Sequence, residues 1–499
     1  MDKKKSILNV VVSISGKLIT MVMSIVVKRF LILYCGNEMN GLNALYLSII
    51  GFMSVAELGI GAAITFSMYK PIVENNMEKV SALYGLYRRL YLIIGAVILA
   101  VGLAISPVIH IFAKDYEQLD VNFSYTFILM LISTVLTYLY SAKMALFNAY
   151  KNNYITTAIT QGGLIFRYVL QIAVLVIVGT FEAYLICRII DCLFQWLVTE
   201  IITRKKYQPV VSLRCIIDQD TRREVMRNVK AMFMHKIGYV LVNTLDSVII
   251  AAFVGVVVLG EYSNYTAILV SLSGVLKLVF TSLTSVLGHM YAQEDRKVAR
   301  EYCEAFHFLN YVIGLVFFLG YYAIIDNLIA ILFDPDLVVE KSISFVITVN
   351  GFVQFMREST LVFRDATGTF YHDRWKPLVE GVANVVFSVL FVKQFGVVGV
   401  IVATIGTNLL ICHIVEPYVL YKFAFMESPK RYYVRNYLCM LIFAVALYLV
   451  DRCMLNLENQ WMDLLGNGMV SVCVAVIACL PMLPLNQKTL HRVMRKKGE

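Results

Sequence analysis

Apolar runs long enough to cross a lipid bilayer follow one another along almost the whole chain. A hydrocarbon core about 30 Å thick requires roughly 20 residues of helix. The run from Leu42 to Tyr69 has one carboxylate, Glu57, near its middle, followed by Gly59 and Gly61. An acidic residue at that depth costs about 2.5–3.5 kcal/mol even on an insertion scale, so it requires a reason. We expect either a glycine-packed helix with a paired carboxylate, or a helix that lines a polar cavity.

The composition excludes an ordinary soluble protein. Hydrophobic residues make up 59% of the 499 residues and charged residues only 16%, with a mean hydropathy of +0.72. A soluble domain has about 45–50% apolar and about 25% charged residues. The ten cysteines form no CxxC pair, which argues against a zinc site or a disulfide framework. There is also no P-loop, Rossmann or HExxH motif, so the sequence predicts no enzyme and no cofactor.

The apolar runs predict an all-α polytopic membrane protein with about 14 transmembrane helices. The first apolar run is too long for a signal-peptide core, so we expect this run to be retained as a membrane helix. The segment 204–232 is charged and separates the sixth span from the seventh. The expected spans are 8–34, 42–68, 89–113, 121–147, 155–178, 181–203, 233–258, 262–291, 305–333, 343–367, 377–395, 397–423, 436–455 and 464–485.

Lysine and arginine residues predict the orientation of these spans. Placing the N-terminus inside puts most basic residues, including those of 204–232 and of the C-terminal tail, in cytoplasmic segments. The external loops then keep only Lys114, Lys341, Lys393 and Arg452. This asymmetry fits the positive-inside rule with both termini cytoplasmic, and it accounts for the formal net charge of +10.

The two halves of the chain resemble each other. Gly41 matches Gly260, Tyr46 matches Tyr265, and a glycine turn recurs at Gly179 and Gly396. The spacing is close to 219 residues, which predicts two six-helix lobes with the same orientation around a central cavity. We therefore expect an N-lobe over 1–203, a cytoplasmic linker over 204–232, a C-lobe over 233–425, and a helix pair with a basic tail over 426–499.

Several charged side chains fall inside the predicted spans. Lys28 and Glu416 lie near an interface, where a long side chain reaches water. Arg188 and Asp191 stand three residues apart and could pair with each other. Lipid exposure of the other cations is too costly, so we expect them to face the interior. The candidates for a cationic substrate cavity are Lys17, Arg167, Lys277, Arg188, Lys236 and Arg357, with Glu57, Asp191 and Glu380 as counter-charges or coupling groups.

A cavity with excess positive charge favours a large anionic ligand. An amphiphile with a phosphate headgroup would place its phosphates on lysine and arginine and its tail between helices. A drug or cation exporter would instead concentrate carboxylates. The balance of charges here favours the anionic, lipid-linked substrate.

One block of sequence resembles a known family. It comprises the run from Ala56 to Ile64 (AELGIGAAI), then 68–71 (MYKP), 78–80 (EKV) and 87–91 (YRRLY). This block is similar to the Wzx-type oligosaccharide repeat-unit flippases, the polysaccharide transporter family of the multidrug/oligosaccharidyl-lipid/polysaccharide (MOP) exporter superfamily. The length, helix number and two-lobed repeat agree over nearly the whole chain.

The resemblance implies a flippase of the bacterial cytoplasmic membrane. By alternating access it would move an undecaprenyl-pyrophosphate-linked oligosaccharide from the cytoplasmic to the outer leaflet, for capsule, exopolysaccharide or O-antigen-like polymers. Polymerases and glycosyltransferases of the pathway would be its partners, and an ion gradient or the membrane potential its energy source. Alternatives are a lipid II flippase, a multidrug or cation antiporter of the same superfamily, and a non-transporting scaffold. The last two predicted spans resemble the extra pair of the lipid II flippase branch.

Overall fold

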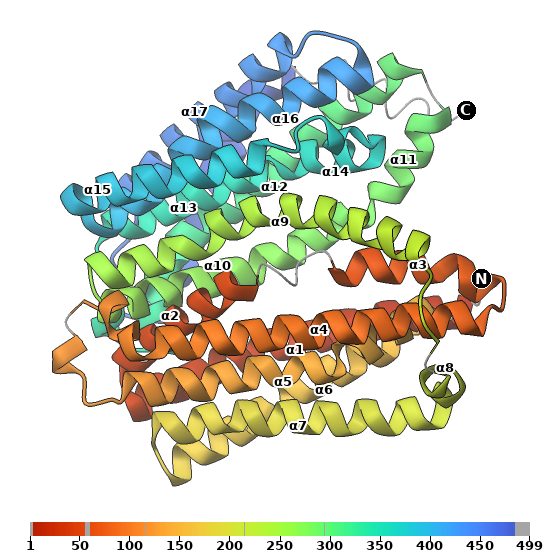
Figure 1. Cartoon of the computed structure of the whole chain (residues 1–499). Coiled ribbons are helices and arrows are strands. Elements are labelled where there is room, and N and C mark those ends of the chain that lie inside the picture. Colours follow the sequence, from red (N-terminus) through yellow and green to blue (C-terminus); the bar gives the residue numbers. More distant parts are fainter. Residues whose placement is uncertain (1–2, 55–59, 115, 214, 294, 485–499) are drawn as a thin grey trace. The chain divides into compact units, whose positions relative to one another are not determined.

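The structure, a computed structural model, describes residues 3–54, 60–114, 116–213, 215–293 and 295–484, and every regular element in these ranges is helical (Figure 1). The predicted all-α fold class is thereby confirmed. The chain forms two compact units, Met1–Gly260 and Glu261–Glu499, which we call the N-terminal and C-terminal units. Glu57 and Gly59 lie outside the described residues.

The N-terminal unit is a bundle in which α5 contacts α4 and α7, and α1 contacts α6 (Figure 1). Its helices are α1 (Lys3–Cys35), α2 (Asn37–Met53), α3 (Ile60–Val73), α4 (Met77–Ile105), η2 (Ser106–Phe112), η3 (Tyr116–Gln118), α5 (Phe123–Ala149), α6 (Asn153–Ile177), α7 (Phe181–Lys206), α8 (Gln208–Ser212), α9 (Gln219–Phe253) and the start of α10 (Val256–Ser282).

Short polar side chains begin several of these helices. Asn76 and Asn122 accept hydrogen bonds from the backbone N–H groups of Lys79 and Tyr125, which a helix start otherwise leaves without partners. Asp218 caps α9 in the same way, and this hydrogen bond from the Thr221 N–H lowers the pKa of the Asp218 carboxyl.

The C-terminal unit is organised around α12, which contacts α13, α17 and α18. Tyr322 on α12 donates to Asp451 at 2.6 Å and Asn327 donates to Asp463 at 2.6 Å, so polar bonds fasten the last two helices to it. The helices are α11 (Thr284–Gln293), α12 (Arg296–Leu332), η4 (Pro335–Leu337), α13 (Lys341–Met356), α14 (Glu358–Thr367), η5 (Thr369–Tyr371), α15 (Lys376–Thr407), η6 (Asn408–Cys412), α16 (His413–Val419), η7 (Leu420–Phe425), α17 (Lys430–Cys453), α18 (Gln460–Cys479) and η8 (Leu480–Met482).

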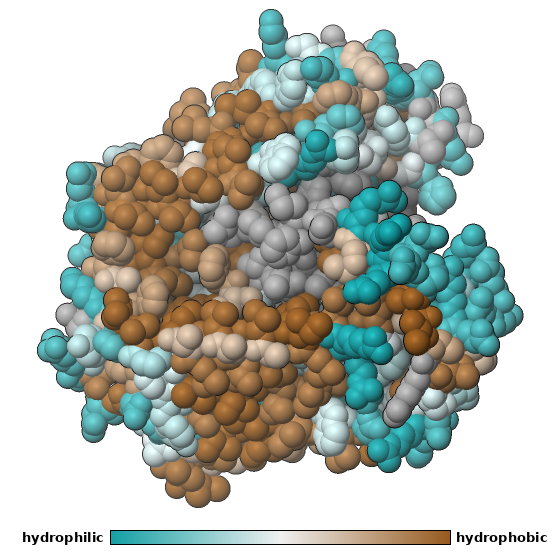
Figure 2. Space-filling view, viewed as in Figure 1, coloured by the Kyte–Doolittle hydropathy of each residue, from teal (hydrophilic) through white to brown (hydrophobic). Residues whose placement is uncertain are grey.

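Eight of the described helices are long and apolar enough to cross a membrane. On the visible face of the N-terminal unit, apolar side chains cover the middle of the helices and polar ones gather at their ends (Figure 2). This is the pattern of a multi-pass membrane protein. The predicted span 262–291 is divided between α10 and α11 at Leu283, and the span 343–367 between α13 and α14 at Arg357. The predicted span 42–68 includes residues 55–59, which lie outside the described residues.

Glycine turns recur at corresponding places in the two halves of the sequence. Gly36 before α2 and Gly255 before α10 both have positive φ, at 87° and 143°, and so do Gly179 and Gly396, at 69° and 56°. Glycine adopts this backbone region without the clash of a Cβ atom. The N-terminal unit extends to Gly260, beyond the predicted lobe boundary, because α9 contacts α2 and α3.

The matched glycines Gly41 and Gly260 mark a close helix crossing inside the N-terminal unit. A Cβ atom on Gly41 would lie 1.9 Å from the carbonyl oxygen of Val256, and one on Gly260 would lie 2.6 Å from that of Asn37. The Asn37 side chain donates to the Val257 carbonyl at 3.0 Å. Small residues permit such backbone contacts between membrane helices.

We predict that Gly41→Ala lowers stability by about 1–3 kcal/mol, because the added methyl group forces α2 and α10 apart. Gly274→Ala is the control, since its Cβ would meet nothing within 4 Å. Thermal unfolding of the detergent-purified protein compares the two. Equal unfolding temperatures for both variants would show that the crossing is not tightly packed.

Candidate functional site

An ion pair joins two membrane helices of the N-terminal unit. Arg167 on α6 lies 3.6 Å from Asp191 on α7, and Asp191 is only 1% exposed. Gln195 donates a hydrogen bond to Asp191 at 2.9 Å. The sequence left open a pairing of Arg188 with Asp191. The structure instead pairs Asp191 with Arg167 on the neighbouring helix, and within the described part of this unit Arg188 has no carboxylate within 4.0 Å.

A glycine makes room for this pair. A Cβ atom on Gly163 would lie 2.6 Å from both the Asp191 carboxylate and the Gln195 amide, so α6 can approach α7 only without a side chain there. The adjacent Gly162 faces open space.

The other N-terminal candidates differ in what the structure shows. Lys17 lies on α1 with an exposed side chain, one residue beyond Gly16, which packs against Gln161. Lys236 belongs to α9, but its side chain is outside the description, as is all of Glu57. The predicted grouping of these residues in one cavity therefore stays a prediction.

The break between α13 and α14 organises the charges of the C-terminal unit. Four consecutive residues at the break bind partners on four different helical segments. Arg357 bonds to Glu416 on α16, Glu358 to Lys277 on α10, Ser359 to His307 on α12, and Thr360 to Tyr432 on α17. The adjacent Arg357 and Glu358 therefore have different partners, Glu416 and Lys277.

Arg357 belongs to a buried network of two cations and two carboxylates. Its guanidinium donates to both oxygens of Glu416, at 2.6 and 3.1 Å, and to Asn408 at 2.6 Å. Lys376 lies 2.6 Å from Glu416 and 3.1 Å from Glu380. The network is neutral as a whole, and bidentate guanidinium–carboxylate bonds are strong and directional. Arg357 is thus committed to protein carboxylates.

Lys277 forms a simpler and more accessible pair. Its ammonium lies 2.7 Å from Glu358, and the two side chains are 42% and 10% exposed. The Lys277 side chain is therefore accessible from outside the protein, whereas Glu358 is largely enclosed.

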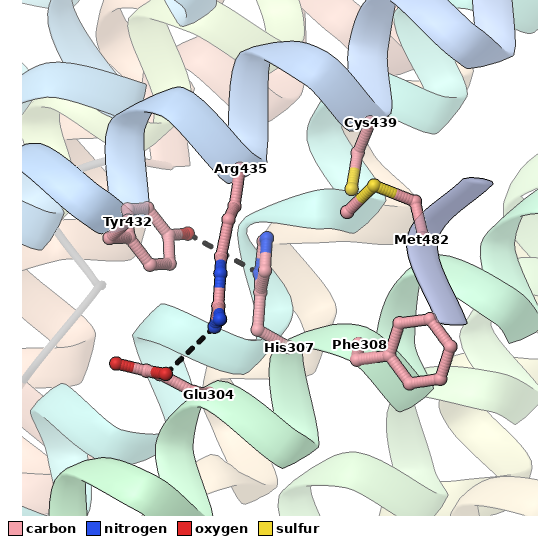
Figure 3. Close-up of a pocket in the computed structure, with 7 residues that line it drawn as sticks. All are labelled: Glu304, His307, Phe308, Tyr432, Arg435, Cys439 and Met482. Carbon is pink, nitrogen blue, oxygen red and sulfur yellow. Dashed lines mark hydrogen bonds and ion pairs between the residues drawn. The ribbon is translucent and has the colours of Figure 1, made fainter. Parts of the chain in front are cut away.

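A small cavity lies between α12, α17 and η8 (Figure 3). Its volume is about 10 Å³, which is roughly the space of one water molecule. Glu304 accepts a hydrogen bond from Arg435 at 2.7 Å, and the His307 ring stands 4.7 Å from that of Tyr432. The lining is Glu304, His307, Phe308, Tyr432, Arg435, Cys439 and Met482. The cavity is too small for a headgroup.

Two expectations from the sequence need correction or addition. Glu416 was expected to reach an interface, but it is 1% exposed, because Arg357 and Lys376 hold it in the core. Lys376 was not among the candidate site residues, yet its side chain is 4% exposed and pairs with Glu380 and Glu416. Its spacing of four residues from Glu380 was a signal for a helical ion pair. Glu304 and Arg435 fell just outside the predicted spans, so their pairing was missed.

The comparisons with known proteins agree on a fold. No family model and no curated protein matches the chain. Among solved structures, a lipid II flippase MurJ in an inward closed conformation has a TM-score of 0.68 at 10% identity, covering 96% of this chain and 99% of the flippase. An inward-facing multidrug resistance MATE family transporter of the MOP superfamily has a TM-score of 0.62 at 14% identity, over 89% of this chain and 99% of the transporter.

A MATE transporter from Vibrio cholerae, VcmN, has a TM-score of 0.55 at 13% identity, covering 86% of this chain and 98% of VcmN. Identities this low show the fold and not the function. The chain therefore has the fold of MOP-superfamily transporters. The Wzx-type assignment within that superfamily is not tested by these matches.

We predict that Glu416→Gln costs about 3–5 kcal/mol of stability, because it leaves two buried cations short of a carboxylate. Glu74→Gln makes the same chemical change in the exposed Lys70–Glu74 pair and should cost less than about 1 kcal/mol. Denaturation in detergent measures both. A small effect of Glu416→Gln would mean that water or lipid headgroups already solvate the network.

The glycine pair on α6 supplies a second test. Gly163→Ala should disturb the Arg167–Asp191 pair and lower stability by about 1–3 kcal/mol, since the methyl group would overlap Asp191 and Gln195. Gly162→Ala, one residue away, should leave the unfolding temperature unchanged or slightly raised, because alanine favours helix. A loss of equal size in both variants would contradict the packing described for Gly163.

Proposed function

We propose that the chain is a flippase for an anionic, lipid-linked oligosaccharide. Its substrate would be an undecaprenyl-pyrophosphate-linked repeat unit, carried from the cytoplasmic to the outer leaflet by alternating access for surface polysaccharide synthesis. Both termini would be cytoplasmic. An ion gradient or the membrane potential would drive the cycle, with no nucleotide site.

The observation that carries the proposal is the accessibility of two intramembrane lysines. Lys17 on α1 and Lys277 on α10 both expose their side chains, and lipid does not solvate an ammonium group. They therefore meet water or an anionic ligand. Ammonium groups bind phosphate oxygens through charge-assisted hydrogen bonds, which suits a pyrophosphate headgroup.

Three buried carboxylates support this choice over a cation exporter. Such an exporter needs a carboxylate that is free to bind its substrate. Asp191, Glu380 and Glu416 are instead each paired with an arginine or a lysine. A role for them in binding a drug cation would require these pairs to open.

A lipid II flippase is the second candidate, favoured by the extent of the structural match. The matched flippase structure covers 96% of this chain, whereas the two MATE structures cover 89% and 86% of it. In each comparison nearly the whole length of the solved structure is matched. The part of the chain beyond the MATE fold is comparable in size to the pair α17 and α18. A peptidoglycan precursor also carries a polyprenyl pyrophosphate, so the same lysines would serve it.

We predict that Lys277→Gln and Lys17→Gln each reduce translocation about tenfold to hundredfold, the loss expected for one charge-assisted hydrogen bond of about 1.5–3 kcal/mol. Lys70→Gln, at an exposed lysine, is the matched control. The measurement is the leaflet of undecaprenyl-linked species in cells depleted of this protein and supplied with each variant.

A glycan repeat unit trapped on the cytoplasmic leaflet would support the oligosaccharide proposal. Accumulated lipid II would assign the protein to the peptidoglycan precursor instead. Unchanged lipids with increased drug sensitivity would refute both and favour a multidrug exporter. Full activity of both lysine variants, with the lipid phenotype intact, would refute the assignment of the site.

A further inference from the structure

The Lys277–Glu358 pair joins an accessible cation to an enclosed carboxylate. Lys277 is 42% exposed and Glu358 10% exposed, and the two charges lie 2.7 Å apart. A phosphate group carries more charge and more acceptor oxygens than a carboxylate, so an anionic headgroup competes effectively for the lysine. The consequence of that competition depends on what happens to Glu358.

The neighbours of Glu358 prevent it from following the lysine. On one side Arg357 is held by Glu416 and Asn408. On the other side Ser359 bonds to His307 at 3.1 Å and Thr360 bonds to Tyr432 at 2.8 Å. Glu358 is thus the first residue of a helix whose start is fixed from both directions.

The other described cations nearby are already matched by carboxylates. Arg357 and Lys376 are balanced by Glu380 and Glu416. A second group, Arg300 and Arg435, is balanced by Glu304 and Glu427. Taking a cation from either group would leave another buried carboxylate unpaired. Transferring one of these cations to Glu358 would therefore only move the unpaired carboxylate to another buried residue.

Other titratable groups lie on segments packed against α14. His307 and Tyr432 are engaged by the residues after Glu358, and Arg364 is paired with Asp373 at 2.8 Å. The titratable groups on these segments include His289 and Tyr291 on α11, Arg300, Glu304 and His307 on α12, Lys341 at the far end of α13, His413 and Glu416 on α16, Tyr371 on η5, and Tyr421 and Lys422 on η7.

We propose that Glu358 is a proton-binding site that exchanges its lysine for a proton when an anionic headgroup takes Lys277. Before binding, the carboxylate and the ammonium neutralise each other. After binding, the ammonium neutralises one charge of the headgroup, and one proton from water neutralises Glu358. An enclosed carboxylate without a cation is costly, and protonation removes that cost. This inference rests on the proposed binding of an anionic headgroup at Lys277.

The exchange predicts a coupling between substrate and protons. Binding takes up one proton, so the affinity falls as the pH rises, by up to about tenfold per pH unit where Glu358 is ionised in the free protein. Release of the headgroup lets Lys277 return to Glu358, which gives up the proton. Substrate and proton thus bind together and leave together.

The experiment counts protons during binding. The purified full chain in nanodiscs is titrated with farnesyl pyrophosphate in two buffers that differ in their heat of ionisation. The unmodified protein should take up about one proton more than Glu358→Gln, whose neutral side chain imitates the protonated acid. The variant should also bind more tightly at high pH and lose that part of the pH dependence. Protonation of the ligand itself is common to both proteins and cancels.

Asp365→Asn is the matched control, because it neutralises an exposed carboxylate two turns further along α14. It should keep the proton uptake of the unmodified protein. A second measurement needs no variant: infrared difference spectra should gain a carboxylic acid C=O band when the probe binds. It remains decisive if Glu358→Gln fails to fold.

The possible results separate this inference from the proposed function. Binding that Lys277→Gln weakens, without extra proton uptake or a new C=O band, contradicts the inference and leaves the proposed function intact. Binding that Lys277→Gln does not change removes the premise and refutes both. Proton uptake that persists in Glu358→Gln assigns the proton elsewhere and also overturns the inference.

Discussion

Lipid cannot solvate a charge, and the structure of this protein depends on how its intramembrane charges are neutralised. The clearest case is the break between α13 and α14. There four successive side chains bind partners on α16, α10, α12 and α17. Successive side chains of a helix lie about 100° apart around its axis, so adjacent residues point in different directions. Because each of the four side chains pairs with a different helical segment, the break joins these segments. This pairing accounts for the charged residues inside the predicted span 343–367.

The two units have glycine turns at corresponding positions but differ in their ion pairs. Glycines with positive φ recur at Gly36 and Gly255 and at Gly179 and Gly396. In the described part of the N-terminal unit, Arg167 and Asp191 form an ion pair between α6 and α7, brought together because Gly163 lets α6 approach α7. The C-terminal unit carries larger neutral networks and fastens α17 and α18 to α12. The two halves therefore share the backbone geometry of these turns and differ in the number and arrangement of their ion pairs.

Cations in this protein fall into committed and accessible classes, and that distinction bears on function. Arg357 has a bidentate carboxylate partner and is poorly placed to release it for a substrate. Lys277 has one partner and an exposed side chain, so it can exchange partners at lower cost. In the proposed exchange, headgroup binding would change the charge state of Glu358.

The sequence by itself determined the class of the fold. Apolar runs of membrane length can only be helices in a bilayer, because lipid leaves each backbone group to find its partner within the helix. The pair Gly179 and Gly396 also predicted a recurring glycine turn, since glycine adopts positive φ where other residues are strained. The presence of charges inside the spans was equally visible, because hydropathy depends on residue type alone.

The partners of those charges were decided only by the tertiary structure. Glu416 looked like an interfacial residue, yet Arg357 and Lys376 draw it into the core from elements 59 and 40 residues away in sequence. Asp191 could have paired with Arg188 on its own helix, but the packing of α6 against α7 gives it Arg167 instead. Pairing depends on which helix faces approach each other and at what depth. Hydrophobic periodicity leaves that unspecified when every helix is apolar on most of its surface.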